Sequence, residues 1–447
     1  MKRLLCPLLF TLIPSLTLAA PLPAWSQQPE PSPPSAQDTA PARNTTSTRA
    51  LTWEQVKMQF ETNNPTLKAD AIGIDEARAA EVTAFLRPNP QFTFATDGTQ
   101  IAPNNGVWKP FLGTQYQSTL SYLHERNHKR QLRLEGAKEA TAISAAQHAD
   151  LIRNLLFTLR SAFVQTLQMK TTLNVAKNDL EYYDKIVTIS QDRFNAGDIA
   201  RIDLDRIELL RVQYEVEIET AAVNLRTAKI QLLQLLSDRT PVEAFDVVGT
   251  FDWSDSLDSL DTLHKIALEN RPDLKAALES TRHALIVHRL ARANGGTDPT
   301  ISAWYTYNPS FNNPNDLQTL GLSINVPLRI FDRNQGEMRR TLLDVDKNAR
   351  TADAAEEQVF SDVDTAHEQL RSNIALLKPY KEKYRDQATR VRDTVTYSYQ
   401  HGGASLMDFL NAQNDFRIVQ LAYLQLVGSY LTSTAQLNLA VGREAIP

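Results

Sequence analysis

The sequence predicts a mainly α-helical fold with a membrane β-barrel portion, built from a duplicated unit of two strands followed by a long antiparallel helical hairpin. Three observations lead to this fold class. Two short motifs each occur twice at nearly the same separation, several stretches of more than 40 residues lack both glycine and proline, and segments of alternating apolar and polar residues precede those stretches. Together they indicate two copies of one strand-and-hairpin unit.

Residues 1–26 form a predicted secretory signal peptide. Lys2 and Arg3 precede an apolar run, and Ala24–Ser26 offers small residues at the spacing of a cleavage site. An N-terminal membrane anchor is the alternative interpretation of this segment. The only cysteine, Cys6, lies inside it, so the mature chain would have neither a disulfide nor a cysteine-based metal or redox site.

Residues 27–50 are predicted to form a disordered tail, because they are rich in proline and small polar residues and carry few bulky apolar side chains. Loss of residues 1–26 removes Lys2 and Arg3 and no acid, so the net charge changes from −5 to −7. A mildly acidic exported protein is a poor partner for nucleic acid. No later stretch approaches the ~18 consecutive apolar residues of a membrane-spanning helix. Insertion into a membrane would therefore require strands.

The duplication rests on two pairs of motifs. Residues 194–203 and 399–408 share an aromatic residue, a glycine three positions later and an aspartate six positions after that, and they lie 205 residues apart. Asn63–Leu67 resembles Asn270–Leu274, which follows 207 residues later. Two matches at nearly one offset favour an internal repeat over chance. The shared positions are Phe194, Gly197 and Asp203 in the first copy and Tyr399, Gly402 and Asp408 in the second.

Each copy is expected to contain, in order, short helices, two strands and a helical hairpin. In the first copy, residues 51–240, the strands lie at about 90–97 and 114–124 and the hairpin at about 128–238. In the second copy, residues 258–442, the strands lie at about 299–307 and 318–328 and the hairpin at about 332–440. Residues 241–257 are expected to form a linker or equatorial segment between the copies.

The hairpins are predicted from the distribution of glycine and proline. Residues 137–196 and 198–240 lack both, and only Gly197 separates them, so one very long helix should turn back into another at this glycine. A helix of about 60 residues is about 90 Å long. In the second copy the turn falls at Gly402-Gly403, and Pro379 should kink the helix before it.

The strands alternate apolar and polar residues. Leu320, Leu322 and Ile324 alternate with Gly321 and Ser323, and aromatic residues stand near the strand ends, which is typical of a membrane β-barrel. A half-buried soluble hairpin is the alternative for any one strand. Four strands cannot close a barrel, and unpaired strand edges are excluded from lipid. A homotrimer would supply twelve strands.

These features resemble the TolC-like outer-membrane factor family over residues 51–442. The resemblance depends on the twin turn motifs, on the segments that follow the short helices Trp53–Phe60 and Leu260–Leu268, and on Pro327–Gly336, which looks like the strand-to-helix junction of the cobalt–zinc–cadmium branch. It implies a homotrimer with a twelve-strand barrel in the outer membrane and a helical tunnel in the periplasm. It also implies that the protein is a passive efflux channel with heavy-metal cations as one cargo. Its partners would be outer-membrane lipid, a periplasmic adaptor and an inner-membrane pump of the RND type.

The resemblance also implies roles for two groups of residues. The hairpin turns would be periplasmic tips on which the adaptor docks, although their glycines also serve simply to form the turns. Two acidic rings after the second turn would narrow the closed pore; Asp408 matches the first ring, but Asn411 occupies the second, which therefore loses its charge. The implied tip residues are Ala196, Gly197, Asp198, His401, Gly402 and Gly403.

No catalytic or cofactor-binding pattern is found, so an enzyme is not expected. His124 and His128 are four residues apart, but His124 should lie at a strand end, so a metal site is not expected either. A periplasmic adaptor, which also carries a long helical hairpin, is the main alternative function, and a secreted coiled-coil protein is a third. An adaptor has one hairpin between glycine- and valine-rich modules, whereas this chain has two hairpins and no such modules. The sequence does not name the cargo.

Overall fold

The computed structural model describes residues 49–103, 105–309 and 317–444. The predicted signal peptide, most of the predicted tail and most of the loop between the second pair of strands lie outside these residues. The tail prediction is wrong at its C-terminal end, because β1 (Arg49–Leu51) pairs in parallel with β4 (Phe245–Val247). Leu51 and Val247 are buried, so this short pairing fixes the start of the described chain to the segment between the repeats.

The same order of elements occurs twice. The first repeat consists of α1 (Trp53–Asn63), α2 (Pro65–Phe85), β2 (Gln91–Asp97), β3 (Gln115–Leu123), α3 (Lys129–Ala196) and α4 (Arg201–Leu235). The second consists of α5 (Leu260–Asn270), α6 (Pro272–Asn294), β5 (Thr300–Tyr307), β6 (Gln318–Asn325), α7 (Gln335–Pro379), the π-helical turn η3 (Tyr380–Tyr384), α8 (Arg385–Gln400) and α9 (Leu406–Val441). The short 3₁₀ helix η1 (Val242–Ala244) precedes β4 between the repeats.

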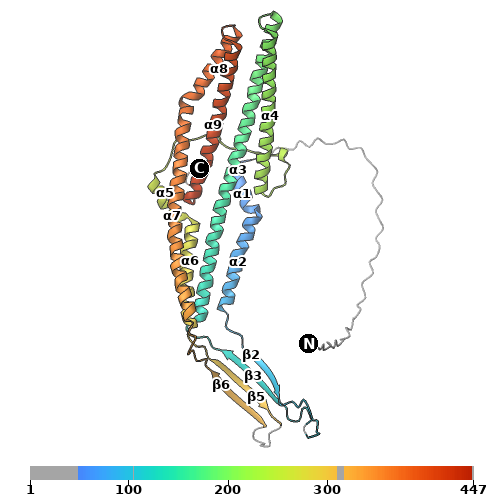
Figure 1. Ribbon diagram of the computed structural model, residues 1–447, viewed down its shortest axis with the longest axis vertical. Helices are drawn as coiled ribbons and strands as arrows, with labels where there is room; N and C mark the ends of the chain where they lie inside the picture. Colours follow the sequence, from blue (N-terminus) through green and yellow to red (C-terminus); the bar gives the residue numbers. More distant parts are fainter. Residues whose placement is uncertain (1–48, 104, 310–316, 445–447) are drawn as a thin grey trace, which may run out of the picture. The chain divides into compact units, whose positions relative to one another are not determined.

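The four strands form one antiparallel sheet in the order β2-β3-β5-β6, with β2 and β6 at its edges (Figure 1). The register runs straight across the sheet, since Phe94 pairs with Ser118, Ser118 with Tyr305 and Tyr305 with Leu320. Directly paired residues share a face. One face is therefore mainly apolar and the other is rich in Ser, Thr and Gln. The apolar face carries Phe92, Phe94, Leu120, Tyr122, Ile301, Ala303, Tyr305, Leu320, Leu322 and Ile324.

The first hairpin is asymmetric. Helix α3 has 68 residues and α4 has 35, and together they span Lys129–Leu235, where the sequence predicts a hairpin at about 128–238. Helix α4 ends because Ser237 adopts a left-handed conformation at φ 53°, a helix stop that contains neither glycine nor proline. The rest of α3 packs against α2 and α6 (Figure 1). These two helices, of 21 and 23 residues, are longer than the short helices predicted before the strands.

The second hairpin departs from regular α-geometry at the predicted position. Pro379 is the last residue of α7, and the π-helical turn η3 connects it to α8. A proline removes one backbone donor and crowds the preceding turn, which explains the irregularity.

Each repeat has its own core at the level of its first short helix. One cluster joins α1, α3, α4, β1 and β4 around Phe60, Phe163 and Leu232, and the other joins α5, α7 and α9 around Leu263, Leu370 and Leu437. A third cluster lies close to the turns and connects the two hairpins. Among the described residues, no helix is both long enough and apolar enough to cross a membrane.

Candidate functional site at the hairpin turns

Both predicted turns have the same backbone geometry. Gly197 and Gly402 adopt left-handed conformations with φ of 86° and 77°. The backbone N–H of Asp198 donates to Arg193 O at 2.8 Å, and that of Gly403 donates to Ser398 O at 2.7 Å, which closes each helix with an equivalent bond. A side chain added at either glycine would meet nothing within 4 Å. These positions therefore favour glycine for its backbone freedom and leave open space around the turn.

The aspartates of the repeated motif lie in the first turns of the return helices. Asp203 is in the first turn of α4 and Asp408 in the first turn of α9. A carboxylate there faces the unpaired N–H groups and the positive end of the helix dipole. Asp408 also forms a capping box: Ser405 Oγ and N donate to its Oδ2 at 2.7 and 3.2 Å, and its own N–H donates to Ser405 Oγ at 3.1 Å. These hydrogen bonds from Ser405 lower the pKa of Asp408.

Asp408 and Asn411 are both exposed and lie one helical turn apart on α9. Phe409 and Ala412, which border this face of the helix, are buried against the rest of the protein. The two residues that the sequence associates with a gate thus share one free face of α9.

The ends of the two hairpins are joined by the aromatic residue of the second motif. Arg193 Nη1 donates to Tyr399 O at 2.8 Å, and its guanidinium lies 5.2 Å from the centre of the Tyr399 ring. Tyr399 stacks on Phe409 at 4.9 Å. The repeat of the motif identifies Tyr399 as the equivalent of Phe194, but only the structure shows that Arg193 connects one hairpin to the other.

A charged group that the sequence does not single out lies further along the same helices. The pKa of Asp179 is raised to about 6, mainly because the carboxyl is buried; Glu217 adds to the rise, while Arg392 and Arg417 oppose it. These four residues come from α3, α4, α8 and α9, and Arg417 also forms an ion pair with Glu217. A single aspartate on a polar helix gives no signal for this environment in the sequence.

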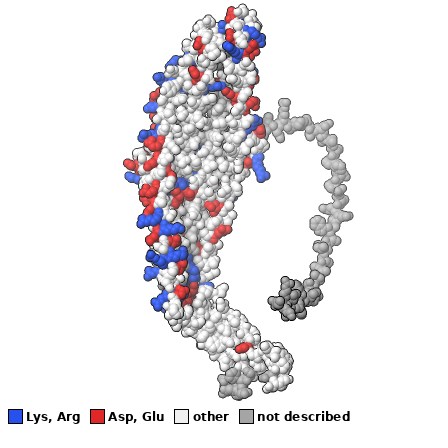
Figure 2. Space-filling model, in the orientation of Figure 1, with Lys and Arg blue, Asp and Glu red and all other residues white. Residues whose placement is uncertain are grey.

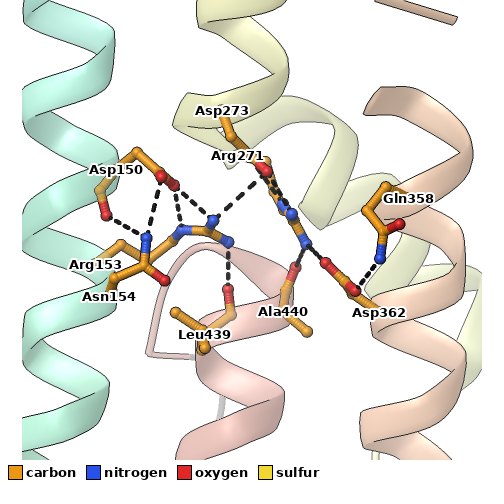
Figure 3. A network of polar contacts seen from close by, with 9 residues as sticks. All are labelled: Asp150, Arg153, Asn154, Arg271, Asp273, Gln358, Asp362, Leu439 and Ala440. Carbon is orange, nitrogen blue, oxygen red and sulfur yellow. Dashed lines mark hydrogen bonds and ion pairs between the residues drawn. The ribbon is translucent and has the colours of Figure 1, made fainter. Parts of the chain in front are cut away.

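A second polar network binds the C-terminal end of α9 to the neighbouring helices (Figure 3). Arg271, which is 4% exposed, forms ion pairs with Asp273 and with Asp362 and donates to Ala440 O at 3.3 Å. Arg153 donates to the neighbouring Leu439 O at 2.8 Å. Two guanidinium groups thus satisfy carbonyls in the last turn of α9, where the helix dipole also favours positive charge.

The histidines do not form a shared site. The backbone of His124 continues the strand pairing through Pro299 O, and His128 precedes α3 with a φ of 57°. Among the described residues, no group of three or more His, Cys, Asp or Glu side chains could hold a metal ion.

The chain is similar to known proteins over most of its length. Residues 263–443 match the family model for outer membrane efflux proteins. The cobalt-zinc-cadmium resistance protein CzcC of Cupriavidus metallidurans is 21% identical over 393 residues, which cover 88% of this chain and 90% of that protein. Among solved structures, the outer-membrane channel OprN superposes with a TM-score of 0.72 at 14% identity, over 87% of this chain and 89% of that one. CusC superposes with a TM-score of 0.71 at 15% identity, over 92% and 99% of the two chains.

The fold, an antiparallel four-stranded sheet continued by two helical hairpins, is that of outer-membrane channel proteins. Residues 263–443 carry the outer membrane efflux protein match, and together with the similarity of the whole chain to CzcC and to solved channels this identifies the protein as an outer-membrane channel of a tripartite efflux system, which extends into the periplasm. The predicted family, fold class and location are confirmed. The alternatives, a periplasmic adaptor and a secreted coiled-coil protein, do not fit this family.

Proposed function

We propose that three copies of this chain assemble into one exit channel, in which their sheets close a twelve-strand barrel and their hairpins form a periplasmic tunnel. The observation that carries the proposal is the open sheet. Its two edge strands, β2 and β6, leave backbone groups unpaired, and its apolar face exposes residues such as Phe92, Leu320 and Leu322. In lipid, unpaired strand edges are prohibitively costly, so β6 of one copy must pair with β2 of the next.

Native mass spectrometry of protein extracted from the outer membrane tests this assembly. A trimer that dissociates on heating is the expected result, whereas a stable monomer in detergent would refute it.

The hairpin turns are the proposed docking points of a periplasmic adaptor, through which an inner-membrane pump of the RND type delivers cargo. Ala196, Gly197 and Asp198 in one turn and His401, Gly402 and Gly403 in the other present open backbone and no bulky apolar side chain. Site-specific photo-crosslinking from Asp198 and His401 tests the assignment. Cross-links to a periplasmic protein are expected, and cross-linkers placed in the β2–β3 loop should not capture it.

Heavy-metal cations are the proposed cargo. The similarity to a cobalt-zinc-cadmium resistance protein over 88% of the chain supports this choice. A deletion strain should lose tolerance of cobalt, zinc and cadmium and regain it when the intact gene is restored. Unchanged metal tolerance together with new sensitivity to dyes or detergents would exclude metals as the cargo and leave the channel assignment in place.

A further inference from the structure

The junctions between the sheet and the helices carry an unusual concentration of positive charge. Three segments meet there: residues 125–135 after β3, residues 289–298 before β5 and residues 329–340 after β6. They contain ten Lys and Arg residues and five Asp and Glu residues, in a chain whose net charge is −5. Figure 2 shows Lys and Arg gathered on the ends of the helices next to the sheet, while the sheet itself is almost uncharged.

Close packing around two glycines holds these segments together. A Cβ atom at Gly295 would lie 2.8 Å from Arg333 O, and one at Gly296 would collide with Asn127 Nδ2. Asn334 Nδ2 also donates to Ala291 O at 2.7 Å. The positive charges therefore belong to one continuous surface.

The acids of this surface are already engaged. Four of them form ion pairs: Glu125 with Arg133, Glu135 with Arg289, Asp298 with Lys129 and Glu337 with Arg340. The fifth, Asp332, accepts a hydrogen bond from the backbone of Asn334. Six arginines form no ion pair among the described residues, and we call them the basic collar. They are Arg126, Arg130, Arg292, Arg329, Arg333 and Arg339.

Two further observations make the collar a candidate binding surface. Arg329 Nε is buried and finds no acceptor among the described residues. A groove of about 640 Å³ lies between the start of α3 and the end of α6, with Arg289, Arg292 and His128 in its wall and Glu135 as its one acid. An anionic group that enters this groove meets the guanidinium of Arg292, which has no ion-pair partner among the described residues and whose geometry suits phosphate oxygens.

The neighbouring sheet identifies the ligand. Residues 90–123 contain only Asp97 and Lys109 as charged side chains, which fits contact with the hydrocarbon interior of a membrane. The collar begins where this uncharged region ends. We infer that the basic collar binds anionic phospholipid headgroups of the periplasmic leaflet, with the groove beside Arg292 as a headgroup site. This inference depends on the proposed function, because the sheet must lie in the outer membrane.

Titration of the detergent-solubilised protein with short-chain phosphatidylglycerol, phosphatidylcholine and inorganic phosphate, followed by calorimetry, tests the inference. Phosphatidylglycerol should bind in preference to phosphatidylcholine, and more weakly as salt rises. Neutralising three arginines, as Arg126→Gln, Arg292→Gln and Arg333→Gln, should weaken its binding about a hundredfold, since each cation near an anionic surface contributes about fivefold. The matched triple Arg206→Gln, Arg226→Gln and Arg390→Gln, on exposed positions of α4 and α8, should bind as the unmodified protein does.

Any one of three results would overturn the inference. These are equal binding of the two lipids, an equal loss of phosphatidylglycerol binding in the two triple variants, and displacement of phosphatidylglycerol by equimolar phosphate. The oligomeric state of the same samples separates it from the proposed function. A trimer without lipid preference refutes the collar alone, whereas a monomer refutes the channel assembly.

Discussion

Asn64 and Arg271 hold equivalent positions in the two repeats, and each donates a hydrogen bond to the equivalent carbonyl of its return helix. Asn64 Nδ2 donates to Leu235 O at 3.2 Å, and Arg271 Nη1 donates to Ala440 O at 3.3 Å. Each residue directly precedes a proline that begins α2 or α6. The residue before the proline therefore connects the start of α2 to the end of α4 in the first repeat, and the start of α6 to the end of α9 in the second.

Replacement of Arg271 should be costly. Arg271→Ala leaves Asp362 without its buried counter-ion, leaves Asp273 with Arg153 as its remaining cation and leaves one carbonyl of α9 unpaired, and should lower the free energy of unfolding by about 3 kcal/mol. Asn64→Ala removes neutral hydrogen bonds only and should cost about 1 kcal/mol. Thermal unfolding in detergent measures both. Arg350→Ala, in an exposed ion pair on α7, is the control and should change little; a similar loss for Arg350 and Arg271 would contradict the role of this network.

Asp179 should make stability depend on pH. Its folded pKa of about 6, raised by burial, lies above the ~3.9 of an unfolded aspartate. Folding thus favours the protonated form of Asp179. Below about pH 4 the carboxyl is protonated in both states and does not destabilise the folded protein. As pH rises from about 4 through about 6, the free energy of unfolding falls, because the charged carboxylate is disfavoured in its buried position. Asp179→Asn should stabilise the protein by about 2 kcal/mol at pH 7.5 and by little at pH 4. The exposed Asp192→Asn serves as control. If Asp179→Asn stabilised the protein equally at both pH values, the buried charge of Asp179 would be excluded as the cause of the stabilisation.

The sequence predicts the features that depend on local chemistry. The duplication, the strands and the glycine turns are visible because each needs particular residues at a fixed spacing. The end of α4 at Leu235 lies close to the predicted end of the hairpin at about residue 238, but the residue that stops the helix is not visible, since Ser237 is neither a glycine nor an asparagine and yet adopts a left-handed conformation. The environment of Asp179 and the contacts of Arg271 with Asp362 and Ala440 depend on helices that are distant in sequence. No local pattern could reveal them.

The turn glycines should be essential for export but not for assembly. Gly197→Val together with Gly402→Val places β-branched residues at positive φ, which should cost about 1–3 kcal/mol at each turn and reshape the tips. Trimers should still reach the outer membrane, while metal tolerance should be lost. Gly336→Val, at an equally open position without positive φ, should leave export intact. Normal tolerance in the double variant would argue against docking at the turns.

The last prediction concerns ion selectivity at the start of α9. If the trimer axis passes near Asp408, three carboxylates meet there and attract cations. Asp408→Asn should then lower cation selectivity and block by multivalent cations, and Asn411→Asp should increase both, because it adds a second acidic ring one turn away. Asp408 also caps α9 through Ser405, so a change in the helix end could mimic a change in charge. Ser405→Ala separates the two effects, since it breaks the capping box and keeps the carboxylate. Single-channel recordings in planar bilayers should show normal selectivity for Ser405→Ala. If Asp408→Asn and Asn411→Asp also conduct like the unmodified channel, these residues do not line the constriction.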